Sequence, residues 1–138
     1  MLYNLHLVQA VPQNKKILVA EDYADIRMMM KILLEVHGYE VIEAADGYEA
    51  VDKAREHSPD LILLDLAMPL MDGLQAVAAM RQHAALVDTP IVAVTAYGDF
   101  YKEKAIEAGC TDVVTKPLDF EGLKPLVEKY LGHDEPAI

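Results

Sequence analysis

The sequence predicts an α/β protein whose single parallel sheet is covered by helices on both faces. Short apolar runs alternate five times with longer segments of helical periodicity. The runs contain almost no polar residues, which is typical of strands buried on both faces of a sheet. The chain has 138 residues, a length that fits one domain. Successive parallel strands then require right-handed crossovers through the helices.

The first half of the chain contains two strand–helix units. KKILVA (15–20) is a β-branched apolar run and predicts a strand. The helix expected over 24–38 has Gly38 as its C-terminal cap and five apolar residues at helical spacing: Ile26, Met29, Met30, Leu33 and Val36. YEVIEA (39–44) is the second strand. The helix expected over 46–57 ends before a Ser-Pro pair.

The second half continues the same alternation with three units. The strands are DLILLDL (60–66), TPIVAVTA (89–96) and CTDVVTKP (110–117), and the helices are expected over 74–83, 99–109 and 120–132. A glycine ends the helix over 99–109. Pro125 is tolerated only near the start of a helix, so the beginning of the last helix stays open.

Composition excludes several classes of function. The net charge of −11 argues against direct binding to nucleic acid, and no apolar run has the length of a membrane span. The single cysteine, Cys110, rules out an internal disulfide, is expected to be a small buried hydrophobe, and suits a reducing cytoplasm. We expect residues 15–131 to form the domain, 1–14 an N-terminal extension and 132–138 a C-terminal tail.

Polar residues follow four of the five expected strands. They are Glu21 and Asp22 after the first strand, Asp65 at the third, Thr95 at the fourth, and Lys116 with Pro117 at the fifth. In open parallel sheets, ligands bind beyond the carboxyl ends of the strands. Three carboxylates meeting there need protons or a cation. Oxygen donors suit Mg²⁺, and the five histidines are too scattered to indicate zinc.

The same residues predict chemistry on phosphorus. Lys116, the Thr95 hydroxyl and Mg²⁺ would surround an anion attached to Asp65, and a carboxylate can attack phosphorus to give an aspartyl phosphate. Taken singly, each residue has an ordinary explanation, such as a turn former, an acid in a first helical turn, or a solvated lysine. The ordered set at successive strand ends favours Asp65 as a nucleophile.

With these residues in place, the sequence resembles the receiver domain of bacterial two-component response regulators. The matching stretches are ILVAED, DLILLDLAMPLMDG, VTA and TKP, and the resemblance runs from Lys15 to Leu131. It implies the flavodoxin-like strand order 2-1-3-4-5. It also implies a single-domain regulator that accepts a phosphoryl group on Asp65 from the phosphohistidine of a sensor histidine kinase or a histidine phosphotransfer protein. Such a protein is not an enzyme beyond catalysing its own phosphorylation and dephosphorylation.

The resemblance also implies roles for individual residues. Asp22 and Asp65 would bind Mg²⁺ through their carboxylates, Ala67 through its carbonyl, and Glu21 mainly through water. Thr95 and Lys116 would contact the phosphoryl oxygens, and a cis bond before Pro117 would aim the lysine at the site. Phosphorylation would then draw Thr95 inward and remodel the face formed by the helix over 99–109, the fifth strand and the last helix.

Two positions depart from the family pattern. Val113 stands where the family usually has a tyrosine or phenylalanine that turns inward on activation. Tyr97, Phe100 or Tyr101 could supply the missing aromatic ring. Tyr97 is also a bulky residue two positions after Thr95, and we expect it to shield the acyl phosphate from water and to lengthen its lifetime.

Several alternatives remain open at the level of sequence. The regulator could bind a downstream protein or pass its phosphoryl group along a relay, and the chain could be cut from a longer protein. A pseudo-receiver would bind proteins without phosphorylation. The acidic set with Thr95 and Lys116 argues against this alternative, although Val113 leaves room for it. A Mg²⁺-dependent phosphohydrolase usually needs a second acid where this chain has Ala67. Weak homodimerisation is a further expectation, through a switch face of mixed charge: Lys102, Glu103, Lys104, Glu107, Asp112, Lys124, Glu128 and Lys129.

Overall fold

The structure, a computed structural model, describes residues 15–116 and 118–132. The expectations about the N-terminal extension, about Pro117 and its peptide bond, and about residues 133–138 lie outside the described residues.

All ten elements predicted from the sequence are present. The strands are β1 (Lys16–Ala20), β2 (Glu40–Ala44), β3 (Leu61–Asp65), β4 (Ile91–Thr95) and β5 (Asp112–Thr115). The helices are α2 (Ala24–Val36), α3 (Gly47–His57), α4 (Gly73–Arg81), α5 (Gly98–Ala108) and α6 (Phe120–Leu131), and one short 3₁₀ helix, η1 (Ala84–Leu86), was not predicted. Pro125 lies within α6, in its second turn.

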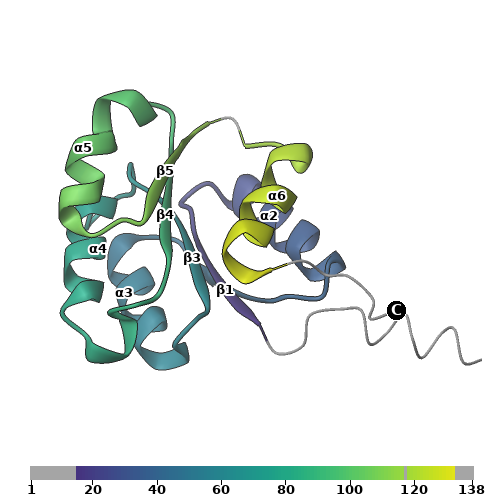
Figure 1. Ribbon diagram of the computed structural model, residues 1–138, viewed down its shortest axis with the longest axis horizontal. Coiled ribbons are helices and arrows are strands. Elements are labelled where there is room, and N and C mark those ends of the chain that lie inside the picture. Colours follow the sequence, from purple (N-terminus) through teal and green to yellow (C-terminus); the bar gives the residue numbers. More distant parts are fainter. Residues whose placement is uncertain (1–14, 117, 133–138) are drawn as a thin grey trace, which may run out of the picture.

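The five strands form one parallel sheet in the order β2-β1-β3-β4-β5, which confirms the flavodoxin-like order. Helices α2 and α6 cover one face of the sheet, and α3, α4 and α5 cover the other (Figure 1). The order reverses direction at β1, so the ends of β1 and β3 lie at a topological switch point. Such a point opens a crevice between neighbouring loops.

Side chains of each strand alternate between two cores. In β1, Ile17 and Val19 pack with α2 and α6, whereas Leu18 and Ala20 pack with α3, α4 and α5. The same alternation in β3 sends Leu61 and Leu63 toward α2 and α6. Asp65, two residues further on, therefore belongs to the face that α2 and α6 cover.

The helices begin in two different ways. Asp46, Asp72 and Asp119 cap α3, α4 and α6, because each side chain accepts a hydrogen bond from a backbone N–H of the first turn. The N-cap of α2 is Tyr23, and its side chain makes no such bond. The loop from β1 to α2 must therefore be fixed by other contacts.

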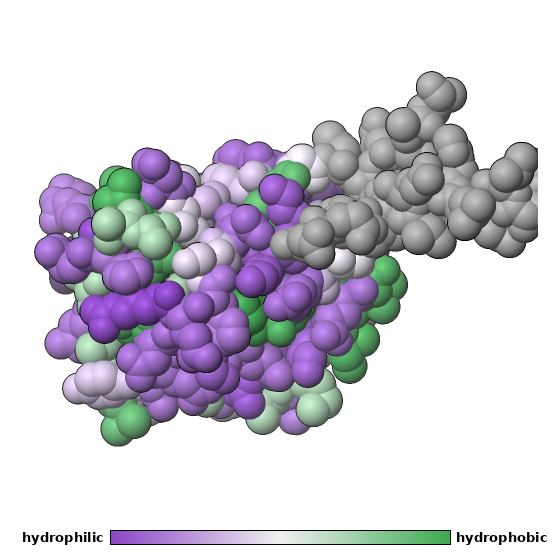
Figure 2. Space-filling view, turned by 90° about the horizontal axis from the view of Figure 1, so that it is seen from below, coloured by the Kyte–Doolittle hydropathy of each residue, from purple (hydrophilic) through white to green (hydrophobic). Residues whose placement is uncertain are grey.

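The surface combines polar side chains with exposed hydrophobic ones. One face is mainly hydrophilic, with separate hydrophobic patches (Figure 2). Among the described residues, no helix combines the length and apolar character that crossing a membrane requires. Cys110 is buried as expected, and burial raises the pKa of its thiol to about 11.

Candidate functional site

Three acidic side chains meet at the carboxyl end of the sheet. Carboxylate oxygens of Glu21, Asp22 and Asp65 all lie within 4.8 Å of one another. Glu21 is only 3% exposed and Asp65 only 5%. Buried charges of one sign are costly unless cations or hydrogen bonds compensate them. The structure thus brings together the three acids that the sequence placed at strand ends.

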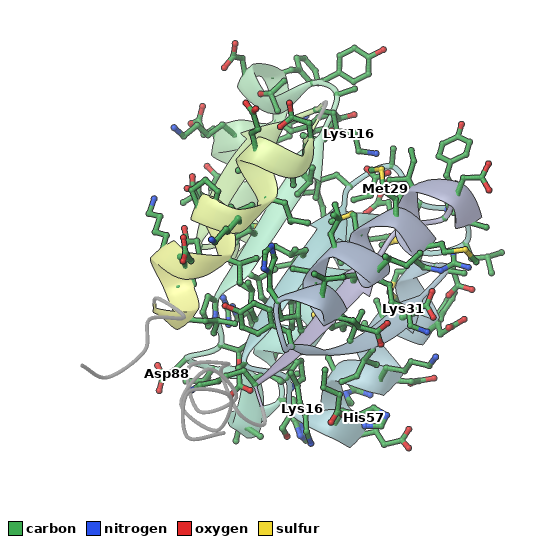
Figure 3. The ribbon with its side chains drawn as sticks, turned by 90° about the vertical axis from the view of Figure 1, so that its right-hand side faces the viewer. Lys16, Met29, Lys31, His57, Asp88 and Lys116 are labelled. Atoms are coloured by element: carbon green, nitrogen blue, oxygen red, sulfur yellow. The ribbon has the colours of Figure 1, made fainter. Side chains whose placement is uncertain are left out.

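Lys116 supplies one compensating charge. It follows β5 and reaches across the end of the sheet toward the first turns of α2, where Met29 lies (Figure 3). Its Nζ donates to Glu21 Oε1 at 2.9 Å and to Asp65 Oδ2 at 3.0 Å. Burial lowers the pKa of Lys116, but the two hydrogen bonds outweigh burial and raise this pKa overall. Burial also raises the pKa of Glu21, although the bond from Lys116 opposes the change.

The loop after β3 holds the second oxygen of Asp65. The backbone N–H of Ala67 donates to Asp65 Oδ1 at 3.0 Å. Gly73 begins α4 close to this loop, and its N–H donates to the Leu66 carbonyl at 2.9 Å. A Cβ atom at Gly73 would lie 2.7 Å from the backbone oxygen of Asp65, so only glycine allows α4 to approach this strand end. Both carboxylate oxygens of Asp65 are thereby oriented.

Asp22 has an oxygen without a partner. Its Oδ1 is buried, and no protein hydrogen-bond donor contacts it. A buried carboxylate oxygen normally has a hydrogen-bond donor or a cation beside it. The donor set around it consists of carboxylates, which suits Mg²⁺. The residues present therefore fit a divalent cation between Asp22 and Asp65.

Glu21 is engaged on both oxygens. Oε1 accepts from Lys116, and Oε2 accepts from the backbone N–H of Tyr23 at 3.2 Å. Both oxygens of Glu21 are therefore oriented by hydrogen bonds, as those of Asp65 are. On the backbone side, Arg27 Nη1 donates to the Glu21 carbonyl at 2.8 Å. No motif in the sequence marks Arg27 as part of the site.

Thr95 is close to the site through its backbone. Its carbonyl accepts from the backbone N–H of Lys116 at 2.8 Å. Its side chain is buried, and its hydroxyl accepts from the N–H of Tyr97 at 3.4 Å, so in this state the hydroxyl binds the following loop. Tyr97 is 69% exposed.

Val113 is half-buried on β5, beside the core of α3, α4 and α5. Tyr101 packs against the same core from α5, and its ring contacts Phe100 edge-on, with centroids 4.9 Å apart. Tyr97, Phe100 and Tyr101 are the residues proposed to supply the missing aromatic ring. The structure partly buries Tyr101, whereas Tyr97 and Phe100 are both largely exposed.

A pocket of about 490 Å³ opens beside the acids. Asp65, Glu21 and Lys116 form one wall. The other wall is apolar and comes mainly from α2 and the segment before α6: Ile26, Met29, Met30 and Leu118. The spacing of the α2 residues of this wall in the sequence predicts only the apolar face of a helix. The structure shows that they also border Asp65.

Comparison with known proteins gives a consistent result. The family model of the response regulator receiver domain matches residues 17–128. The polar-differentiation response regulator DivK of Brucella ovis is 35% identical over 122 residues, which cover 86% of this chain and 98% of that protein. DivK of Brucella anthropi is 35% identical over 121 residues.

Solved structures agree in fold. The chemotaxis response regulator CheY4 of Vibrio cholerae has 34% identity and a TM-score of 0.81, over 86% of this chain and 99% of that one. The receiver domain of a sensor histidine kinase of Pseudomonas aeruginosa has 31% identity and a TM-score of 0.78, over 86% and 98%, and holds a magnesium ion in its active site cleft. From the match over most of its length, the chain belongs to the family of response regulator receiver domains of two-component systems.

Proposed function

We propose that this receiver domain accepts a phosphoryl group on Asp65 from the phosphohistidine of a sensor histidine kinase or a histidine phosphotransfer protein. The observation that carries the proposal is the position of Asp65: it is buried, held by Ala67 and Lys116, and borders an open pocket. Phosphorylation and Mg²⁺ binding are general properties of the family, which supports the assignment.

In the proposed step, a carboxylate oxygen of Asp65 forms a bond to phosphorus. The bond between phosphorus and the imidazole nitrogen of the donor breaks, and the histidine keeps the electron pair and takes up a proton. Lys116 stabilises the charge that develops on the phosphoryl oxygens, because its ammonium already lies 3.0 Å from Asp65. Thr95 would turn its hydroxyl from the Tyr97 N–H to the phosphoryl group.

Mg²⁺, when bound, neutralises the carboxylates and the phosphoryl oxygens. We assign Asp22 and Asp65 as carboxylate ligands, the Ala67 carbonyl as a backbone ligand, and Glu21 as a ligand through water. The unpartnered oxygen of Asp22 supports its place in this set, and the short distances among the three carboxylates support the shared site.

We further propose that residues 15–131 act as the receiver unit, in the cytoplasm, with 1–14 and 132–138 as its extension and tail. The output surface would be the face of α5, β5 and α6, read by a downstream protein or used in a relay. Because Val113 lacks a ring, we assign the aromatic part of the switch to Tyr101, which is partly buried against the same core as Val113.

The test is phosphorylation by acetyl phosphate, followed by intact mass. Wild type should gain the mass of one phosphoryl group only with Mg²⁺, and Asp65→Asn should gain none. Asp72→Asn is the matched control: it removes a carboxylate from the same loop and keeps a good N-cap for α4, so it should be phosphorylated like wild type. A folded wild type that binds Mg²⁺ without gaining mass would instead favour the pseudo-receiver, a protein-binding module independent of phosphorylation.

A further inference from the structure

We propose that Arg27 is a positioning residue for the Mg²⁺ site, acting through the backbone between Glu21 and Asp22. The inference rests on the proposed function, because it concerns the same cation. It starts from the β1–α2 loop, which carries two of the three acids and leads into a helix without a side-chain cap. Such a loop needs other contacts to keep one conformation.

The guanidinium of Arg27 makes the required contact. Nη1 donates to the carbonyl oxygen of Glu21 at 2.8 Å, a good distance for a charge-assisted hydrogen bond. This carbonyl belongs to the peptide unit that joins Glu21 to Asp22. Because a peptide unit is planar and rigid, holding its oxygen also fixes the direction in which the Asp22 backbone leaves it. Arg27 therefore controls where the Asp22 carboxylate points.

Arg27 is itself held in place. Its Nε donates to Glu43 Oε1 at 3.3 Å, and its side chain is only 18% exposed. Glu43 also pairs with Lys31 at 3.3 Å through its other oxygen, and its backbone carbonyl accepts from Lys53 at 2.7 Å. Glu43 lies on β2, next to β1, so the contacts tie α2 to the edge of the sheet. A guanidinium with two fixed partners has little rotamer freedom left.

The opposite face of the loop is held separately. The N–H of Glu21 donates to Ala44 at 3.0 Å, and the N–H of Tyr23 donates to the Glu21 carboxylate. Neither bond involves the Glu21–Asp22 peptide unit itself, whose carbonyl oxygen is the group that Arg27 holds. If this peptide unit turned, the free oxygen of Asp22 would leave its place near Asp65.

Positioning and charge predict opposite effects. A guanidinium near a divalent cation repels it, so if Arg27 acted by charge alone, Arg27→Gln would tighten Mg²⁺ binding and Arg27→Lys would leave it unchanged. If Arg27 positions Asp22, both variants weaken binding, because lysine keeps the charge but cannot serve Glu21 and Glu43 with a planar fork. Loss of an outer partner of a metal ligand typically lowers metal affinity by about tenfold or more.

The experiment is calorimetric titration of the whole chain with MgCl₂. We expect Mg²⁺ dissociation constants about tenfold higher in Arg27→Gln and Arg27→Lys. Lys31→Gln removes a cation from the Glu43 carboxylate without touching the β1–α2 loop, so its Mg²⁺ dissociation constant should stay close to that of wild type. Urea unfolding without Mg²⁺ shows whether each variant is folded during the titration. If Arg27→Gln does not fold, Arg27→Lys carries the test.

Glu43 provides a second arm. Glu43→Gln keeps an oxygen for Arg27, so this variant should bind Mg²⁺ like wild type. Glu43→Ala should weaken Mg²⁺ binding. Combined with Arg27→Lys, however, Glu43→Ala should weaken Mg²⁺ binding only a little further. Unchanged or tighter Mg²⁺ binding in the Arg27 variants would overturn the inference. A wild type that binds no Mg²⁺ would overturn the proposed metal site itself, so the two failures can be distinguished.

Discussion

Replacing Lys116 by methionine tests whether one ammonium holds the acidic site together. In wild type this ammonium bonds to Glu21 at 2.9 Å and to Asp65 at 3.0 Å, and both carboxylates are almost completely buried. Removing one partner of a buried ion pair costs about 3 to 5 kcal/mol. The Lys116 side chain is 23% exposed, so water can partly replace it in the variant. We therefore expect the free energy of unfolding to fall by the low end of this range, about 3 kcal/mol.

The assay is thermal unfolding followed by circular dichroism, with and without Mg²⁺. For a chain of this length, about 3 kcal/mol lowers the melting temperature by about 10 °C. Added Mg²⁺ should stabilise Lys116→Met more than wild type, since no ammonium competes for the carboxylates. An affinity about tenfold higher adds about 1.4 kcal/mol at saturating Mg²⁺. Lys102→Met, which removes an exposed lysine of α5, is the control for net charge.

The pH dependence has a definite sign. Since the folded-state pKa of Lys116 is raised above its ordinary 10.5, its contribution to stability is complete below pH 10.5 and is lost as the pH rises through the folded pKa. On the alkaline side of neutrality, the difference in stability between wild type and Lys116→Met should therefore shrink only in strongly alkaline solution. If the variant melts at the wild-type temperature near neutral pH and gains no more from Mg²⁺, Lys116 does not compensate the carboxylates and the reasoning is wrong.

Three further changes test other parts of the molecule. Arg81→Gln removes a guanidinium that donates to three carbonyl oxygens at 2.6 to 2.9 Å, so its free energy of unfolding in urea should fall by about 3 kcal/mol. The exposed Arg55→Gln should lose none, and equal losses in the two variants would contradict this expectation. Gly73→Ala places a Cβ 2.7 Å from a backbone oxygen at the end of β3, and should lower the free energy of unfolding by about 1 to 3 kcal/mol in the same assay. An unchanged stability would refute the close approach of α4 to β3. Tyr97→Ala should shorten the lifetime of the acyl phosphate, followed by intact mass after removal of the donor, while the equally exposed Phe100→Ala should not; an unchanged lifetime for Tyr97→Ala ends the shielding hypothesis.

The strands and their order of appearance could be read from the sequence because β3 and β4 are buried on both faces and therefore consist of uninterrupted apolar runs. The acids could be found because Glu21 and Asp65 are each the first polar residue after an apolar run, and Asp22 directly follows Glu21. Helix ends followed from local chemistry: Gly38 adopts a positive φ of 94° after α2, as expected of a C-terminal glycine. The short η1 was missed because its three residues carry no periodic pattern.

Other features depend on contacts that leave no trace in the sequence. Arg27 bonds to a backbone carbonyl, and every residue offers one, so no residue type marks the pair. The hydroxyl direction of Thr95 depends on its rotamer and on the Tyr97 N–H. The apolar face of α2 is wider than the part of this helix that packs against the sheet. Met29 therefore lines the pocket, although its spacing is that of a core residue.

Two cationic side chains, those of Lys116 and Arg27, bond to Glu21, and the different atoms that they bind separate their roles. Lys116 binds the carboxylate, which it must share with Asp65, whereas Arg27 binds the backbone carbonyl. A phosphoryl group on Asp65 would offer Lys116 new oxygens and draw it from Glu21, but would offer nothing to Arg27, whose second partner is Glu43. Arg27 is therefore expected to hold the loop alike in the free and the phosphorylated protein, while Lys116 changes partners between the two states.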